Sequence, residues 1–93
     1  MKYHVYMIIT KKINRYITYV GYSKNIEKRL LLHNSSKGAK FTKGNYWKII
    51  YQKKYNSKSE AMKAENNLKK NYKYRLKLKN KFINDENINI ASL

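Results

Sequence analysis

The chain opens with two stretches in which β-branched and aromatic residues dominate, a composition typical of strands. They read YHVYMIIT over residues 3–10 and YITYVGY over residues 16–22. The segment KKINR between them is polar and short, which predicts a hairpin connection. We therefore expect two antiparallel strands at the start of the fold.

The register of this hairpin decides whether two tyrosines share a face of the sheet. If Thr10 pairs with Arg15, Tyr6 lies directly opposite Tyr19, and opposed residues point to the same face. A shift of one residue would place the two phenols on opposite faces.

The hydrophobic spacing becomes helical after Ser23. Either Ser23 or Asn25 can cap the helix, and Ile26 opens its apolar stripe. Arg29 and His33 follow Ile26 by three and seven residues, so both flank that stripe. A charged and a titratable side chain thus lie beside the face that packs on the sheet.

A polar loop, NSSKGAKFTKGN over residues 34–45, separates this helix from a third predicted strand. The strand reads YWKIIYQKKY over residues 46–55, and its alternation places Trp47, Ile49 and Tyr51 on one face.

The remainder of the chain is helical in pattern. The segment SKSE at residues 57–60 is a capping box, and it precedes an apolar stripe that includes Ala61 and Leu68. Glu65 interrupts this stripe with a carboxylate where a core residue is expected. A third, lysine-rich helix is predicted from Tyr72 to about Ile83, followed by a flexible C-terminal tail over residues 84–93.

These elements predict a single α+β domain over residues 1–83. We expect a three-stranded antiparallel sheet flanked by helices, in the order β-β-α-β-α-α. The chain has 93 residues, enough for one modest hydrophobic core.

The charge of the chain points to a polyanionic partner. There are 22 Lys+Arg against 5 Asp+Glu, a net charge of +17. A field this positive attracts nucleic acid first, with anionic membrane surfaces and acidic proteins as alternatives. No signal-peptide pattern or membrane-length apolar run occurs and cysteine is absent, so we expect a cytoplasmic protein, monomeric or weakly dimeric, that binds DNA and no membrane.

Common catalytic motifs are missing. No P-loop pattern occurs, and His4 and His33 lack the spacing of metal ligands. The residues that remain unexplained by packing are Tyr6, Tyr19, Arg29, His33 and Glu65.

Four segments, in order, resemble the GIY-YIG nuclease superfamily. VYM at residues 5–7 and YVG at residues 19–21 are similar to its two name-giving tripeptides. SKNIEKRLLLHN with SSKGAKFTKG, and then SKSEAMKAENNLKK, are similar to its catalytic helix and loop and to its metal-binding helix. The match resembles small stand-alone members and the nuclease domain of the bacterial excinuclease.

The resemblance implies roles for the five unexplained residues. Tyr6 and Tyr19 would be the motif tyrosines, one of which helps to activate the attacking water. Arg29 would stabilise charge on the scissile phosphate, and His33 would be an auxiliary base or a phosphate ligand. Glu65 would hold one divalent metal ion, Mg²⁺ or Mn²⁺.

The implied function is a metal-dependent DNA endonuclease, with DNA repair or recombination as its setting. The DNA-contacting residues we expect are exposed lysines of the loop and of the metal-binding helix: Lys37, Lys40, Lys43, Lys69 and Lys70. Gly21 would be the glycine of the second tripeptide, which lets backbone approach closely. The preferred DNA structure and any protein partner are not indicated.

The sequence also departs from the family pattern. His4 replaces the glycine of the first tripeptide, Tyr22 stands where excinuclease relatives carry a lysine, and Lys77 stands where they carry an asparagine. The alternative is therefore a nucleic-acid-binding module that keeps the fold and has lost catalysis. In that alternative Glu65 simply pairs with Lys69 at i+4, and the tyrosines pack the sheet.

Overall fold

The computed structural model describes the backbone of residues 2–91 and the side chains of residues 2–86. Its sheet has the strand order β2-β1-β3, with both pairs antiparallel. The strands are β1 (Tyr3–Lys12), β2 (Arg15–Ser23) and β3 (Lys48–Tyr55). Because β1 is central, its alternate residues face both sides of the sheet.

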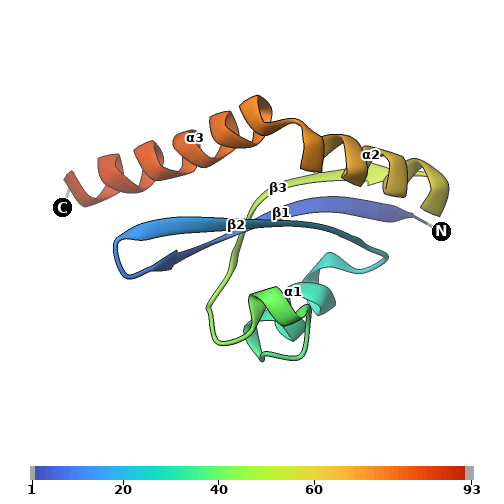
Figure 1. Cartoon of the computed structure of the whole chain (residues 1–93), viewed down its shortest axis with the longest axis horizontal. Helices are drawn as coiled ribbons and strands as arrows, with labels where there is room; N and C mark the ends of the chain where they lie inside the picture. The colour runs from blue at the N-terminus through green and yellow to red at the C-terminus, as the bar shows by residue number, and fades with distance from the viewer. Residues whose placement is uncertain (1, 92–93) are drawn as a thin grey trace.

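The helices cover the two faces of this sheet unequally (Figure 1). One side carries α1 (Ile26–Asn34) and the loop with the short 3₁₀ helix η1 (Lys40–Thr42). The other side carries α2 (Lys58–Lys70) and α3 (Tyr72–Ala91). The α+β fold and the element order β-β-α-β-α-α are confirmed. No helix in the described part of the chain is long and apolar enough to cross a membrane.

The hairpin register differs from the expected one by two residues. Lys12 pairs with Arg15, so Tyr6 lies opposite Gly21, and Tyr19 lies opposite Ile8. The turn is tighter than predicted, with Ile13 in the left-handed region at φ 57°. A shift of two residues preserves the face of every side chain, so Tyr6 and Tyr19 still share a face.

A bulge corrects the prediction for the third strand. Met7 pairs with Tyr51 but Ile8 pairs with Ile49, which leaves Ile50 as an additional residue on β3. The bulge reverses the side-chain alternation, so Ile49 and Trp47 pack on the α1 side whereas Tyr51 packs on the other.

The helix starts follow from local capping. Asn25 caps α1 through its side chain, which accepts a hydrogen bond from the Lys28 backbone N–H at 3.0 Å. Ser57 caps α2 in the same way, accepting from the Glu60 N–H at 3.2 Å. These bonds satisfy backbone donors that the first helical turn leaves unpaired.

The predicted end of the third helix was wrong. The helix α3 continues through Ala91, well beyond Ile83, and so replaces most of the flexible tail expected over residues 84–93; residues 92–93 lie outside the described part. No glycine or proline interrupts this stretch, and two side chains dock it on the sheet. The Phe82 ring meets Tyr16 edge-on at 6.3 Å, and Glu86 pairs with Lys48 at 3.9 Å.

Candidate active site

Tyr6 reaches the outer edge of the sheet because a glycine lies beside it. A Cβ atom on Gly21 would come within 2.5 Å of the Tyr6 Oη. The Tyr6 phenol therefore lies across β2, the edge strand, which only glycine at this position allows. Gly21 is a structural requirement of the Tyr6 position.

A chain of buried hydrogen bonds begins at this phenol. Tyr6 Oη lies 2.8 Å from His33 Nε2, and His33 Nδ1 lies 2.8 Å from Thr42 Oγ1. The Thr42 hydroxyl donates to the Ala39 carbonyl at 2.8 Å. Tyr6, His33 and Thr42 are at most 2% exposed, so these bonds form away from solvent.

The direction of each bond follows from the Thr42 hydroxyl. Its single hydrogen is directed to the Ala39 carbonyl, so its oxygen accepts from His33 Nδ1–H. A neutral histidine protonated at Nδ1 has Nε2 as its acceptor, and Tyr6 Oη–H then donates to it. The tyrosine proton thus points at the atom that can take it.

The charge states agree with this direction. Burial lowers the pKa of His33 below its ordinary 6.5, and the neighbouring positive charge of Arg29 lowers it further, so the imidazole is neutral near pH 7. Burial raises the pKa of Tyr6 above 10, an effect that Arg29 opposes. The resting pair is therefore a phenol beside a neutral imidazole.

The pKa of Tyr6 also shows which other groups lie within electrostatic reach. After burial and Arg29, Tyr19 and Glu65 each raise the pKa of Tyr6. The Tyr19 ring meets the His33 ring edge-on, with centroids 5.4 Å apart. The structure thus brings all five residues singled out in the sequence to one edge of the sheet, from helices on opposite faces.

Arg29 carries an unusual buried donor. Its Nε is shielded from solvent and, among the residues that the structure describes, is the buried side-chain polar atom without a hydrogen-bond partner. A buried, unsatisfied donor on a charged group costs free energy, which an anionic ligand would recover.

Glu65 lies on α2 with its side chain only 16% exposed, and its Oε1 contacts Lys69 Nζ at 3.1 Å. This is the i,i+4 pair that the sequence allowed as an alternative. No cluster of three or more metal-ligating side chains occurs in residues 2–86. A single carboxylate fits a Mg²⁺ ion that keeps most of its waters and takes substrate oxygens, and it does not fit an ion enclosed by protein ligands.

The loop after α1 is fastened at several points that the sequence did not reveal. Asn34 hydrogen-bonds the backbone of Trp47 in both directions, and the Trp47 indole N–H donates to the Thr42 carbonyl at 2.9 Å. A Cβ on Gly38 would come within 2.5 Å of His33 Nδ1, so this glycine makes room for the imidazole. Gly44, with φ +77° and open space around it, is the loop glycine that conformation alone explains.

The remaining predicted positions lie around this edge or away from it. The five lysines assigned to DNA are all exposed: Lys37, Lys40, Lys43, Lys69 and Lys70. Tyr22 pairs with Val5 and packs against the core on the α2 side, on the face opposite to Tyr6. A core-packing tyrosine therefore occupies the position at which relatives carry a lysine.

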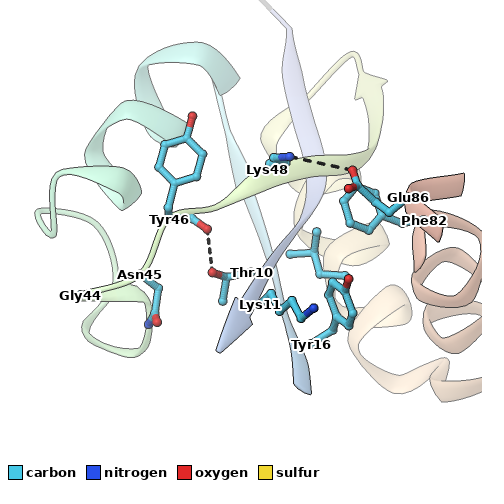
Figure 2. Close-up of a pocket in the computed structure, with 10 residues that line it drawn as sticks. Thr10, Lys11, Tyr16, Gly44, Asn45, Tyr46, Lys48, Phe82 and Glu86 are labelled. Atoms are coloured by element: carbon cyan, nitrogen blue, oxygen red, sulfur yellow. Dashed lines mark hydrogen bonds and ion pairs between the residues drawn. The ribbon is translucent and has the colours of Figure 1, made fainter. Parts of the chain in front are cut away.

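A second hollow, of about 440 Å³, lies at the hairpin end of the sheet and contains none of the predicted site residues. Figure 2 shows Tyr16 and Phe82 on one side of it and Tyr46 on the other, with the Lys48–Glu86 ion pair between them. The paired charges neutralise each other there, so we find no chemistry to assign to it.

Comparison with known proteins agrees with the geometry. Residues 2–80 match the model of the GIY-YIG catalytic domain. The chain belongs to the GIY-YIG family. This membership points to nuclease-type chemistry and supports a site at the edge formed by β2.

Several bacterial relatives are similar over most of their length. A UPF0213 protein of Staphylococcus saprophyticus is 39% identical over 73% of this chain and 80% of its own, and one of Staphylococcus haemolyticus is 41% identical over the same shares. A UPF0213 protein of Oceanobacillus iheyensis is 46% identical over 55% of this chain and 60% of its own. These are small stand-alone GIY-YIG proteins. No solved structure matches the chain.

Proposed function

We propose that this protein is a metal-dependent endonuclease that hydrolyses phosphodiester bonds in DNA, in a cytoplasmic repair or recombination setting. The observation that carries the proposal is the buried chain from Tyr6 through His33 to Thr42, placed beside the unpartnered Arg29 Nε. A fold needs neither feature for stability alone, since a buried polar chain replaced by apolar groups of the same shape would be nearly neutral.

Tyr6 activates water in this proposal with help from His33. A phenol is a weak base near pH 7 while it holds its proton. Neutral His33 accepts the Tyr6 proton at Nε2, and the phenolate oxygen takes a proton from the attacking water. Thr42 keeps the imidazole in the required tautomer by accepting from Nδ1–H. Of the two motif tyrosines, Tyr6 is favoured as the base because it is the one bonded to His33.

Arg29 binds the scissile phosphate in this proposal. The guanidinium offers its buried Nε–H to a phosphate oxygen, and its charge stabilises the negative charge that develops as the bond to the leaving oxygen breaks. Arg29 also opposes the rise in the pKa of Tyr6, so the same group favours formation of the phenolate.

Glu65 holds the divalent ion, Mg²⁺ or Mn²⁺, in this proposal. When bound, such an ion supplies positive charge near the leaving oxygen. Glu65 must release Lys69 to bind it, and Lys69 is then available to a DNA phosphate. The exposed lysines and the net charge of +17 support DNA as the substrate.

The Glu65–Lys69 pair also favours the second candidate function. A carboxylate neutralised by an ammonium at 3.1 Å needs no metal, as expected for a DNA-binding module without catalysis. The two candidates differ in what Glu65 contributes when Lys69 is removed.

A plasmid-nicking assay separates them. Purified wild-type protein should nick supercoiled DNA with Mg²⁺ or Mn²⁺ and stop when EDTA is added. Glu65→Gln should abolish nicking and retain DNA binding, whereas the matched variant Lys69→Gln, which breaks the same ion pair, should retain nicking. Stability should change by no more than about 0.5 kcal/mol in either variant, the usual worth of such a pair. Equal metal-dependent nicking by Glu65→Gln and wild type would contradict the metal assignment.

A further inference from the structure

A hollow of about 380 Å³ opens at the β2 edge, next to the candidate active site. Its volume lies within the range of small-ligand pockets, about 300–1,000 Å³. It is lined by two aromatic rings, two basic side chains and the strand between them: Thr18, Tyr19, Val20, Phe41, Lys69 and Arg75. Phe41 and Arg75 have no part in the chemistry proposed above.

Phe41 is the most exposed aromatic residue of this hollow and yet is held firmly. Its side chain is 60% exposed, and its ring stacks on Tyr19 with centroids 6.1 Å apart and an interplanar angle of 21°. On its other side it contacts the buried Trp47 at 6.4 Å. Its neighbour Thr42 is bonded to His33, so the backbone that carries Phe41 is tied to the active site.

The exposed side of this stack has the properties of a nucleobase platform. A flat aromatic ring binds any base through its π-face, and basic groups beside it attract the flanking phosphates. Lys69 and Arg75 are those groups. Arg75 is fixed in place, because its Nε–H donates to the Leu68 carbonyl at 3.1 Å and its guanidinium lies 5.7 Å from the Tyr72 ring.

We propose that Phe41 stacks with an unpaired nucleobase adjacent to the phosphate that is cleaved. A base between two rings needs about 7 Å, twice the 3.4 Å spacing of stacked bases, so it extends the Tyr19–Phe41 stack instead of entering it. A base inside a duplex is already stacked on both sides and cannot reach this ring. The substrate class is therefore DNA that is single-stranded at the site of cleavage; this deepens the proposed function and takes DNA as the ligand from it.

Binding measured in EDTA tests this platform independently of catalysis. The probes are a fluorescently labelled oligothymidylate and a duplex of the same length. Phe41→Ala should weaken binding of the oligothymidylate roughly tenfold, which is the effect of losing one stacked base, and leave duplex binding unchanged. The matched control Tyr46→Ala removes another aromatic side chain, 71% exposed and outside this hollow, and should change neither.

Two further measurements exclude a purely structural effect. Phe41→Trp should preserve oligothymidylate binding and Phe41→Leu should lose it, while all the variants keep the wild-type circular dichroism. An oligonucleotide containing 5-bromouracil should photocrosslink to the peptide that contains Phe41. Equal losses for single-stranded and duplex DNA, or a Phe41→Ala variant that binds like wild type, would overturn the proposal. Because no metal is present, a protein that binds in this way but never nicks DNA would contradict only the proposed function.

Discussion

The two faces of the sheet are built from different chemistry, although β1 supplies both. On the α2 side, Val5 and Met7 pack with Ala61 and Leu68 in an apolar core. On the α1 side, the intervening residue Tyr6 enters a chain of buried hydrogen bonds with His33 and Thr42. One strand thus alternates between residues that hold the fold together and a residue that we assign to chemistry.

This difference shows where the stability of the domain resides. The two large helices α2 and α3 lie over the apolar face, whereas α1 has nine residues and a short fastened loop behind it. Polar groups on the α1 side have satisfied partners, except for the Arg29 Nε, at least within the part of the chain described. We therefore expect substitutions on the two faces to have separable effects.

The largest expected effect on folding comes from the apolar face. Met7 is fully buried, so Met7→Ala should lower the free energy of unfolding by about 2–5 kcal/mol through lost transfer energy and a cavity. Chemical denaturation monitored by circular dichroism measures this loss. Nicking per folded molecule should remain close to wild type; a specific loss of activity would show that the two faces are not separable.

The next effect is on catalysis alone, at Arg29. Arg29→Lys should lower the nicking rate by about 10²–10³-fold, because an ammonium cannot reproduce a fixed guanidinium donor at the phosphate. The melting temperature should stay nearly unchanged, since the substitution keeps the charge and removes an unsatisfied donor. Wild-type nicking by Arg29→Lys would mean that this residue contributes only positive field.

The smallest effect is the pH dependence of stability due to His33. Its pKa is lowered in the folded protein, so between that value and about 6.5 the unfolded chain binds more protons than the folded one. Stability should therefore fall as the pH drops through 6.5. Denaturation of wild type and His33→Gln between pH 7 and pH 5 measures it: the stability difference between them should shrink toward acid pH. A constant difference would contradict the buried, neutral imidazole.

Local features of the fold were predictable because their causes are local. The caps at Asn25 and Ser57 form the bonds that their side chains favour. The hairpin register was not predictable from hydrophobic alternation, because a shift of two residues leaves the pattern intact. The bulge at Ile50 was hidden for a related reason, since Trp47, Ile49 and Tyr51 alternate regularly in the sequence.

The site was predictable only in part. Resemblance supplied Tyr6, Tyr19, Arg29, His33 and Glu65, and the structure brings them together. It did not supply Thr42 or Phe41, because a threonine and a phenylalanine in a polar loop carry no periodic signal. Gly38 was expected to serve loop conformation, and its contact with His33 became visible only in three dimensions.

The most direct test of the account compares two tyrosines of the same sheet. Tyr6→Phe removes the hydroxyl that His33 accepts from, whereas Tyr16→Phe removes a hydroxyl near Phe82, on the far side of the hairpin. The measurement is the single-turnover nicking rate with Mn²⁺ at saturating protein, with the fold of each variant checked by circular dichroism. The account predicts a loss of about 10²–10⁴-fold for Tyr6→Phe, the usual contribution of a general base, and no loss for Tyr16→Phe. Equal nicking by Tyr6→Phe and wild type would contradict the assignment of catalysis to the Tyr6–His33 pair.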